Sequence, residues 1–176
     1  IKKLGVDYLD MYIIHRPPGA VHGSWKAMEE LYNEGKIKAI GVSNFDATQL
    51  ADLLAMAKIK PVINQIEINP YFQQAEFVKT VQKLGLQVEG WSPFAQGRNG
   101  MFTNEVLVGI GKKHNKTAAQ VVLRWLIQRD IVAIPRTENP AYMKENLEVF
   151  DFKLSEADMK EISKLDKKTS QFTEWK

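Results

Sequence analysis

The feature that most constrains the fold is a repeated alternation of two patterns along the chain. A β-branched or apolar run is followed each time by a cluster of Gly, Pro or Asn and then by a segment with helical periodicity. The runs succeed one another at intervals of 29, 24, 25 and 44 residues, and they begin near Leu9, Lys38, Val62, Gln87 and Ile131. Because these runs are apolar on both faces, they predict parallel strands joined by helices in an α/β fold.

Capping residues indicate where the predicted helices begin and end. Ser24 is placed to cap the first helix, and Gly35 to end it in the left-handed conformation. Capping-box pairs predict two further helices, from Asp46 with Gln49 and from Thr117 with Gln120. Apolar periodicity or a cap predicts the remaining helices, over residues 77–84 and 106–110, after Asn139-Pro140 and after Ser155.

Composition excludes several classes of protein. A chain of 176 residues with 44% hydrophobic and 26% charged residues is typical of one globular domain, here residues 1–176. The absence of cysteine rules out disulfides, thiolate metal sites and a cysteine nucleophile, and no metal-ligand spacing is present. No apolar run approaches the roughly 20 residues that cross a bilayer, and the first residues lack a signal-peptide core. We therefore expect a cytoplasmic protein with no membrane association.

The distribution of charge argues against a nucleic-acid partner. The chain carries 24 Lys and Arg against 21 Asp and Glu, a formal charge of +3. The basic residues are spread along the chain in short pairs such as Lys112-Lys113 and Lys167-Lys168. Because no basic patch is evident, we expect these charges to lie on a solvated surface.

Polar and aromatic residues follow every predicted strand. In parallel α/β folds the chemistry lies just past the carboxyl ends of the strands. The residues at these ends are, in order, His15-Arg16, Ser43-Asn44, Gln65, Trp91 to Gly97 and Arg136-Thr137. Taken singly, each has a structural interpretation, such as a turn, a buried amide or a surface cation. Together they predict one ligand site built from several strands.

Other titratable residues fit less specific interpretations. Glu67 and Glu89 could form the paired carboxylates of a glycoside hydrolase, but Glu89 lies in mid-strand, where a structural contact is expected. His22 and His114 lie in polar surroundings, so both are expected to face solvent.

Several motifs, in this order, resemble the aldo-keto reductase family. They cover nearly the whole chain and lie at residues 9–15, 35–45, 64–71, 91–94, 134–136 and 145–152. The bacterial members similar to 2,5-diketo-gluconate reductase and prostaglandin F synthase resemble the chain most. The resemblance implies a (β/α)8 TIM barrel that transfers a hydride between NADP(H) and the carbonyl of a small aldehyde, ketone or keto acid.

The same resemblance implies which part of the barrel this chain supplies. It would be the carboxyl-terminal portion, with the last five strands and their helices, one extra helix before the last barrel strand and one carboxyl-terminal helix. The first strands of the barrel would be missing. The full-length protein is expected to be a monomer whose only partner is the small carbonyl substrate.

The resemblance also assigns roles around the nicotinamide. His15 matches the catalytic histidine that donates a hydrogen bond to the substrate oxygen. Trp91 matches an aromatic residue that stacks on the nicotinamide and lines the substrate site. The residues that match the carboxamide contacts are Ser43, Asn44 and Gln65, and those that match the loop over the pyrophosphate are Ser92, Pro93, Phe94, Gln96 and Gly97.

At the adenosine end, Arg136 and Thr137 match the pair that grips the 2′-phosphate. Glu145 and Asn146 match residues that bind the adenine amino group. Tyr142 stands where the family usually has an arginine, so it can stack on adenine but brings no positive charge. A lost charge-assisted contact is worth about 1.5–3 kcal/mol. NADPH is therefore the expected cofactor, through Arg136, and NADH is a possible alternative.

The chain also departs from the family pattern. Nothing in it matches the family's catalytic Asp, Tyr and Lys, so the chain alone is expected to be inactive. Tyr12 lies three residues from His15 on the same strand, which places the two on opposite faces, and it receives no proton-donor role. Arg16 either favours anionic carbonyl substrates or points to solvent. The alternative function is a catalytically incomplete nucleotide-binding or subunit-like protein of the same superfamily.

Overall fold

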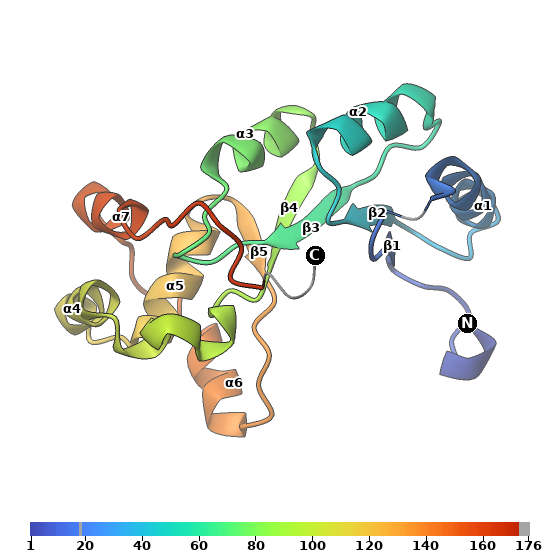
Figure 1. Ribbon diagram of the computed structural model, residues 1–176. Helices are drawn as coiled ribbons and strands as arrows, with labels where there is room; N and C mark the ends of the chain where they lie inside the picture. Colours follow the sequence, from blue (N-terminus) through green and yellow to red (C-terminus); the bar gives the residue numbers. More distant parts are fainter. Residues whose placement is uncertain (18, 173–176) are drawn as a thin grey trace. The chain divides into compact units, whose positions relative to one another are not determined.

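The computed structural model describes residues 1–17 and 19–172. Its strands form one sheet whose order follows the sequence, as Figure 1 shows. β1 pairs with β2 and β2 with β3 in parallel, with Tyr12 opposite Ile40 and Ser43 opposite Gln65. The strands are β1 (Tyr12–Ile14), β2 (Ile40–Ser43), β3 (Ile63–Glu67), β4 (Gln87–Trp91) and β5 (Ile131–Ala133). The predicted alternation of strands and helices in an α/β fold is confirmed.

The helices lie in the predicted segments. Residues 2–4 and 95–103 add two 3-10 segments, η1 and η2, that the sequence analysis did not predict. The α-helices are α1 (Val21–Asn33), α2 (Ala47–Met56), α3 (Ala75–Lys83), α4 (Glu105–His114), α5 (Ala118–Ile127), α6 (Pro140–Leu147) and α7 (Glu156–Ser163).

Most of the predicted caps are confirmed, and one is wrong. Asp46, Thr117 and Ser155 each close a capping box, and Asn139 caps α6. Ser24 does not cap α1, because the helix begins one turn earlier and the Ser24 N–H already donates to the carbonyl of Ala20. A serine near a helix start therefore indicated the helix correctly but misplaced its first residue.

The chain divides into two compact units. Unit 1 comprises Ile1–Ile66 and Glu76–Val88, and unit 2 comprises Glu67–Ala75 and Glu89–Lys176. Each unit has its own apolar core and is described by itself.

The core of unit 1 lies between its strands and helices. β2 is buried along its whole length, and α2 and α3 lie side by side in Figure 1. Gly41 of β2 lies so close to β3 that a Cβ at this position would be 2.3 Å from Cγ2 of Ile63. β1 differs from the prediction of strands buried on both faces, since Tyr12 is 49% exposed. The reason is its place at the end of the sheet, where only β2 covers one edge.

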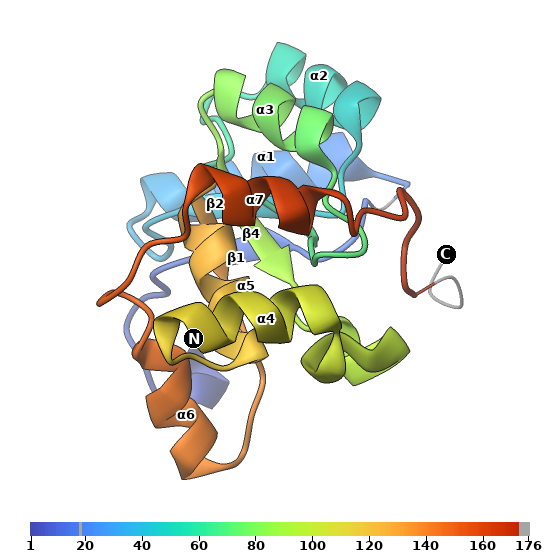
Figure 2. The ribbon, with the colours of Figure 1, turned by 90° about the vertical axis from the view of Figure 1, so that its left-hand side faces the viewer.

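The core of unit 2 is built on α5. Its inward face buries Val121, Val122, Trp125 and Leu126 almost completely. α4 packs against both α5 and α7, as can be followed in Figure 2. The residues of unit 2 that are predicted to bind ligand lie outside this core, in the loop after β4, in the segment before α6 and on α6 itself.

Candidate active site

Unit 1 brings together the residues predicted to hold the nicotinamide carboxamide. The buried hydroxyl of Ser43 donates to the carbonyl of Gln65 at 2.8 Å, and the Asn44 N–H donates to the same carbonyl at 2.9 Å. The Asn44 side-chain amide donates to the Ser43 hydroxyl and to the carbonyl of His15, both at 3.0 Å. One hydrogen-bonded cluster therefore connects the carboxyl ends of β1, β2 and β3.

Backbone geometry explains how Asn44 reaches these partners. Its φ of 60° lies in the left-handed region, which asparagine adopts more readily than most residues. This turn ends β2 and lets the side chain bond back toward the end of β1. The arrangement is preorganised, because its hydroxyl and amide groups are held by hydrogen bonds within unit 1.

His15 follows β1 directly, and its side chain is exposed. A pocket of about 450 Å³ lies against it, between β1 and α1, and is otherwise largely apolar. Arg16 is exposed as well. The structure thus places both residues directly after β1, where the carbonyl of His15 accepts from Asn44.

Unit 2 carries the loop predicted to pass over the pyrophosphate. Several of its non-glycine residues adopt positive φ, among them Ser92, Ala95, Gln96 and Asn99. Each such conformation costs about 1–3 kcal/mol and tends to be kept where a backbone serves a function. Phe94 packs on Phe102, with ring centroids 5.4 Å apart, and holds the loop closed on itself. Within the same loop, Pro93 is buried and Gly97 has a φ of 76°.

The residues predicted at the adenosine end lie before and on α6. Arg136 is 89% exposed and pairs with the equally exposed Glu138 at 2.8 Å. Thr137 is half-buried and accepts from the N–H of Asn139. On α6, Asn146 is half-buried and Tyr142 is 56% exposed.

Glu145 shows how α6 is fixed to the rest of unit 2. One of its carboxylate oxygens accepts from the Thr117 hydroxyl at 2.6 Å, and its carbonyl accepts from the side chain of Gln120. The predicted adenine contact therefore shares its carboxylate with a structural bond. This bond positions the helix that carries Tyr142.

One titratable cluster was missed by the sequence analysis. Asp158 of α7 is buried and accepts from Lys113 at 2.8 Å and from Ser155, and it lies 3.5 Å from the His114 ring. Burial raises the pKa of Asp158, but the hydrogen bonds from Lys113 and Ser155 outweigh it and lower the pKa below its ordinary value. The expectation that His114 faces solvent is wrong, because α7 covers it.

A second buried charge also belongs to the structure of unit 2. Arg129 stacks on Trp125 and donates to the carbonyl of Gln73 at 2.9 Å. Burial lowers the pKa of Arg129 to about 10, although Asp166 opposes this effect. Apolar periodicity of α5 could predict the buried face but not the cation at its end.

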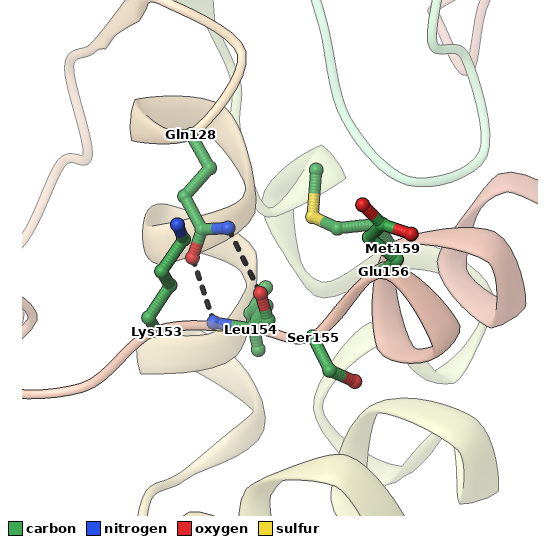
Figure 3. A pocket seen from close by; sticks show the side chains of 6 residues that line it. All are labelled: Gln128, Lys153, Leu154, Ser155, Glu156 and Met159. Atoms are coloured by element: carbon green, nitrogen blue, oxygen red, sulfur yellow. Dashed lines mark hydrogen bonds between the residues drawn. The ribbon is translucent and has the colours of Figure 1, made fainter.

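The hollow beside α7 carries none of the predicted site residues. It measures about 590 Å³, and Figure 3 shows the side chains that line it. Gln128 there exchanges two hydrogen bonds with the backbone of Leu154, at 2.7 and 3.0 Å. These bonds fix the segment that leads into α7, which is a structural task.

No group of His, Cys, Asp and Glu in residues 1–17 and 19–172 is arranged to hold a metal ion. Among the described helices, none has both the length and the apolar character needed to cross a membrane.

Two curated reductases are similar in sequence to most of this chain. Glyoxal reductase of Bacillus subtilis is 45% identical over 168 residues, which are 95% of this chain and 60% of that protein. Methylglyoxal reductase DkgA of Escherichia coli is 41% identical over 169 residues, 94% of this chain and 62% of that protein. The chain thus spans about three-fifths of the length of these curated relatives.

Solved structures show the same similarity. An aldo-keto reductase from a Medee basin deep-sea metagenome superposes with a TM-score of 0.94 at 41% identity, over 99% of this chain and 66% of that one. A Bombyx mori aldo-keto reductase in complex with NADP gives 0.90 at 33% identity, over 99% and 63%. The aldo/keto reductase family profile matches residues 1–167. On this match, and on the fold it shares with these structures, the chain belongs to the aldo/keto reductase family.

Proposed function

We propose that this chain is the NADP(H)-binding part of a reductase that acts on the carbonyl of small aldehydes, ketones or keto acids. Two relatives are named as reductases of glyoxal and methylglyoxal, which favours small 2-oxoaldehydes among these substrates. A similar structure holds NADP, which favours this cofactor.

The observation that carries the proposal is the cluster of Ser43, Asn44 and Gln65. A carboxamide both donates and accepts hydrogen bonds, and the side-chain amides of Asn44 and Gln65 are of the type that matches both requirements. The Ser43 hydroxyl and the Asn44 N–H groups hold the cluster together. The cluster is fixed before any ligand arrives, so little side-chain freedom remains to be lost on binding. We assign to it the nicotinamide end of the cofactor.

Unit 2 provides side chains suited to the other end. Arg136 forms an exposed ion pair with Glu138. Because exposed ion pairs are weak, a phosphate can displace Glu138 at little cost in free energy. Thr137 adds a hydroxyl, and Tyr142 adds an exposed ring for adenine. We assign the pyrophosphate to the loop from Ser92 to Gly97, where Ser92, Ala95 and Gln96 are held at positive φ.

The chemistry divides between cofactor and protein. When bound, the cofactor supplies or accepts the hydride. His15 donates a hydrogen bond to the substrate oxygen and so orients the carbonyl and stabilises charge that develops on it. For keto acids, the exposed guanidinium of Arg16 adds a contact to the substrate carboxylate.

We further propose that the chain is the carboxyl-terminal portion of a (β/α)8 barrel and is inactive without the remainder. About two-fifths of the length of these relatives lies outside the match. β1 exposes Tyr12 and, next to it, Met11, an apolar edge suited to a preceding strand. Since nothing in the chain matches the family's Asp, Tyr and Lys, a general acid would come from that preceding segment, and losing one costs about 10²- to 10⁴-fold in rate.

The test is a pair of measurements on this chain and on the protein made from its complete reading frame. We expect both to bind NADPH, measured by cofactor fluorescence, and only the longer protein to oxidise NADPH with methylglyoxal. His15→Gln should reduce turnover without weakening NADPH binding, whereas the control His22→Gln, at an exposed hydrogen bond with Asp52, should change neither.

Three results would count against the proposal. Absence of NADPH binding by both proteins would exclude the cofactor assignment. Binding without turnover by the longer protein, across a panel of aldehydes and keto acids, would favour the catalytically incomplete nucleotide-binding protein. A complete protein of 20.1 kDa would exclude the missing barrel strands.

A further inference from the structure

Glu67, the last residue of β3, is a buried carboxylate for which the proposed reaction has no use. It is 5% exposed and accepts from the Asn69 side chain at 3.1 Å. Two further partners come from the carboxyl-terminal segment of unit 2: the Ser170 hydroxyl at 2.5 Å and the Gln171 N–H at 2.9 Å. Since donors surround it, Glu67 is not placed to exchange a proton with a substrate.

The same carboxyl-terminal segment is held from a second side. The carbonyl of Gln171 accepts from the Arg98 guanidinium at 2.6 Å, and its side-chain oxygen accepts from the Asn99 amide at 2.7 Å. Arg98 and Asn99 belong to η2, which continues the loop predicted to cover the pyrophosphate. Residues 170–171 are therefore fastened between the end of β3 and this loop.

These bonds fix the position of Phe172. The phenyl ring is 1% exposed and packs on Trp91, with ring centroids 5.2 Å apart and planes tilted by 55°. The Arg98 guanidinium lies 4.5 Å from the centre of the same ring. Rings at this spacing attract one another and restrict each other's rotation. The orientation of Trp91 thus depends on a segment about eighty residues further along the chain.

We propose that Glu67 is a positioning residue that fastens residues 170–172 and, through Phe172, fixes the ring of Trp91. The functional part of this inference rests on the proposed function, in which Trp91 stacks on the nicotinamide and lines the substrate site. Glu67 and Phe172 then determine the orientation of the Trp91 ring that lines the substrate site, although neither takes part in hydride or proton transfer. The fastening itself is independent of any cofactor.

Hydrogen exchange tests the fastening without a ligand. The Gln171 N–H donates to Glu67 and the Phe172 N–H donates to Ser170, so both amides report on it. In Glu67→Gln and in Ser170→Ala we expect exchange at residues 171–172 to rise by about ten-fold or more, with the rest of unit 2 unchanged. The matched control is Glu161→Gln, which removes an exposed carboxylate on α7.

Fluorescence tests the link to Trp91. The fluorescence emission lost in Trp91→Phe is the contribution of the Trp91 ring. Acrylamide quenches this contribution in proportion to the accessibility of the ring. We expect Glu67→Gln and Phe172→Ala to raise the quenching of this contribution by about two-fold or more, and Glu161→Gln to leave it unchanged. A purely structural role for Glu67 would not move this signal selectively.

Binding separates this inference from the proposed function. We expect Glu67→Gln to raise the Kd for NADPH by about three- to ten-fold and to leave unchanged the Kd for 2′,5′-ADP, which lacks the nicotinamide. Unchanged exchange at residues 171–172 in both variants, or an equal rise throughout unit 2, would overturn the fastening. If exchange and quenching respond but neither ligand binds the unaltered chain, the proposed function fails and the fastening stands.

Discussion

Arg136→Gln tests the assignment of the adenosine 2′-phosphate to unit 2. A charge-assisted bond to a phosphate is worth about 1.5–3 kcal/mol. The phosphate must first displace Glu138, and the ion pair it replaces is worth about 0–1 kcal/mol because both side chains are more than four-fifths exposed. The net contribution is about 0.5–3 kcal/mol, equivalent to about 2- to 150-fold in Kd.

Calorimetric titration with 2′,5′-ADP and with AMP measures this contribution directly, because the two ligands differ only in the 2′-phosphate. We expect Arg136→Gln to raise the Kd for 2′,5′-ADP by the factor above and to change the Kd for AMP by less than about two-fold. Glu138→Gln should strengthen binding of 2′,5′-ADP by up to about five-fold, since it releases the guanidinium.

Lys144→Gln is the matched control, because it removes one exposed positive charge from α6. If Lys144→Gln weakens 2′,5′-ADP as much as Arg136→Gln does, the effect arises from overall charge and the assignment is wrong. Equal weakening of AMP and 2′,5′-ADP by Arg136→Gln would also refute the reasoning.

Three further predictions concern packing, pH dependence and specificity. Gly111→Ala should lower the free energy of unfolding, measured by urea denaturation, by about 1–3 kcal/mol, because the new Cβ would lie 2.3 Å from the carbonyl oxygen of Lys116. Gly109→Ala, in the same helix, adds its Cβ in open space and should raise the free energy of unfolding by up to about 1 kcal/mol. Asp158→Asn should lower the free energy of unfolding at neutral pH. The difference in unfolding free energy between the variant and the unaltered chain should shrink below about pH 4, because the folded-state pKa of Asp158 lies below its unfolded value and its stabilisation is lost on acidification. A difference independent of pH would contradict this. In the full-length reductase, Arg16→Gln should raise the KM for keto acids about ten-fold more than that for neutral aldehydes, and equal changes would reject the specificity role.

Much of the fold follows from local patterns. Strand positions came from apolar runs because residues buried on both faces must be apolar whichever neighbours they have. Helix starts came from capping boxes because Asp46 and Thr117 satisfy backbone N–H groups within three residues. The prediction of a cap at Ser24 was wrong because a serine can also lie within the first turns of a helix.

The candidate site could be predicted only as a set of residues. The motif at Ser43-Asn44 indicated a contact for a ligand, and the structure added the bonds that fix it to Gln65 and His15. The approach of His114 to Asp158 could not be foreseen, because the two residues lie on helices whose packing no local pattern specifies.

The sequence by itself determined the family, the alternation of strands and helices and the identity of the residues at the strand ends. These depend on side-chain chemistry and on interactions within a few residues. Only the tertiary structure decided what those residues touch. The sequence argued against a catalytic carboxylate pair of Glu67 with Glu89 but gave Glu67 no partner. In the structure it holds residues 170 and 171 and, through them, Phe172 against Trp91. The physical reason is that hydrogen bonds between residues a hundred positions apart form only after the core has brought the segments together.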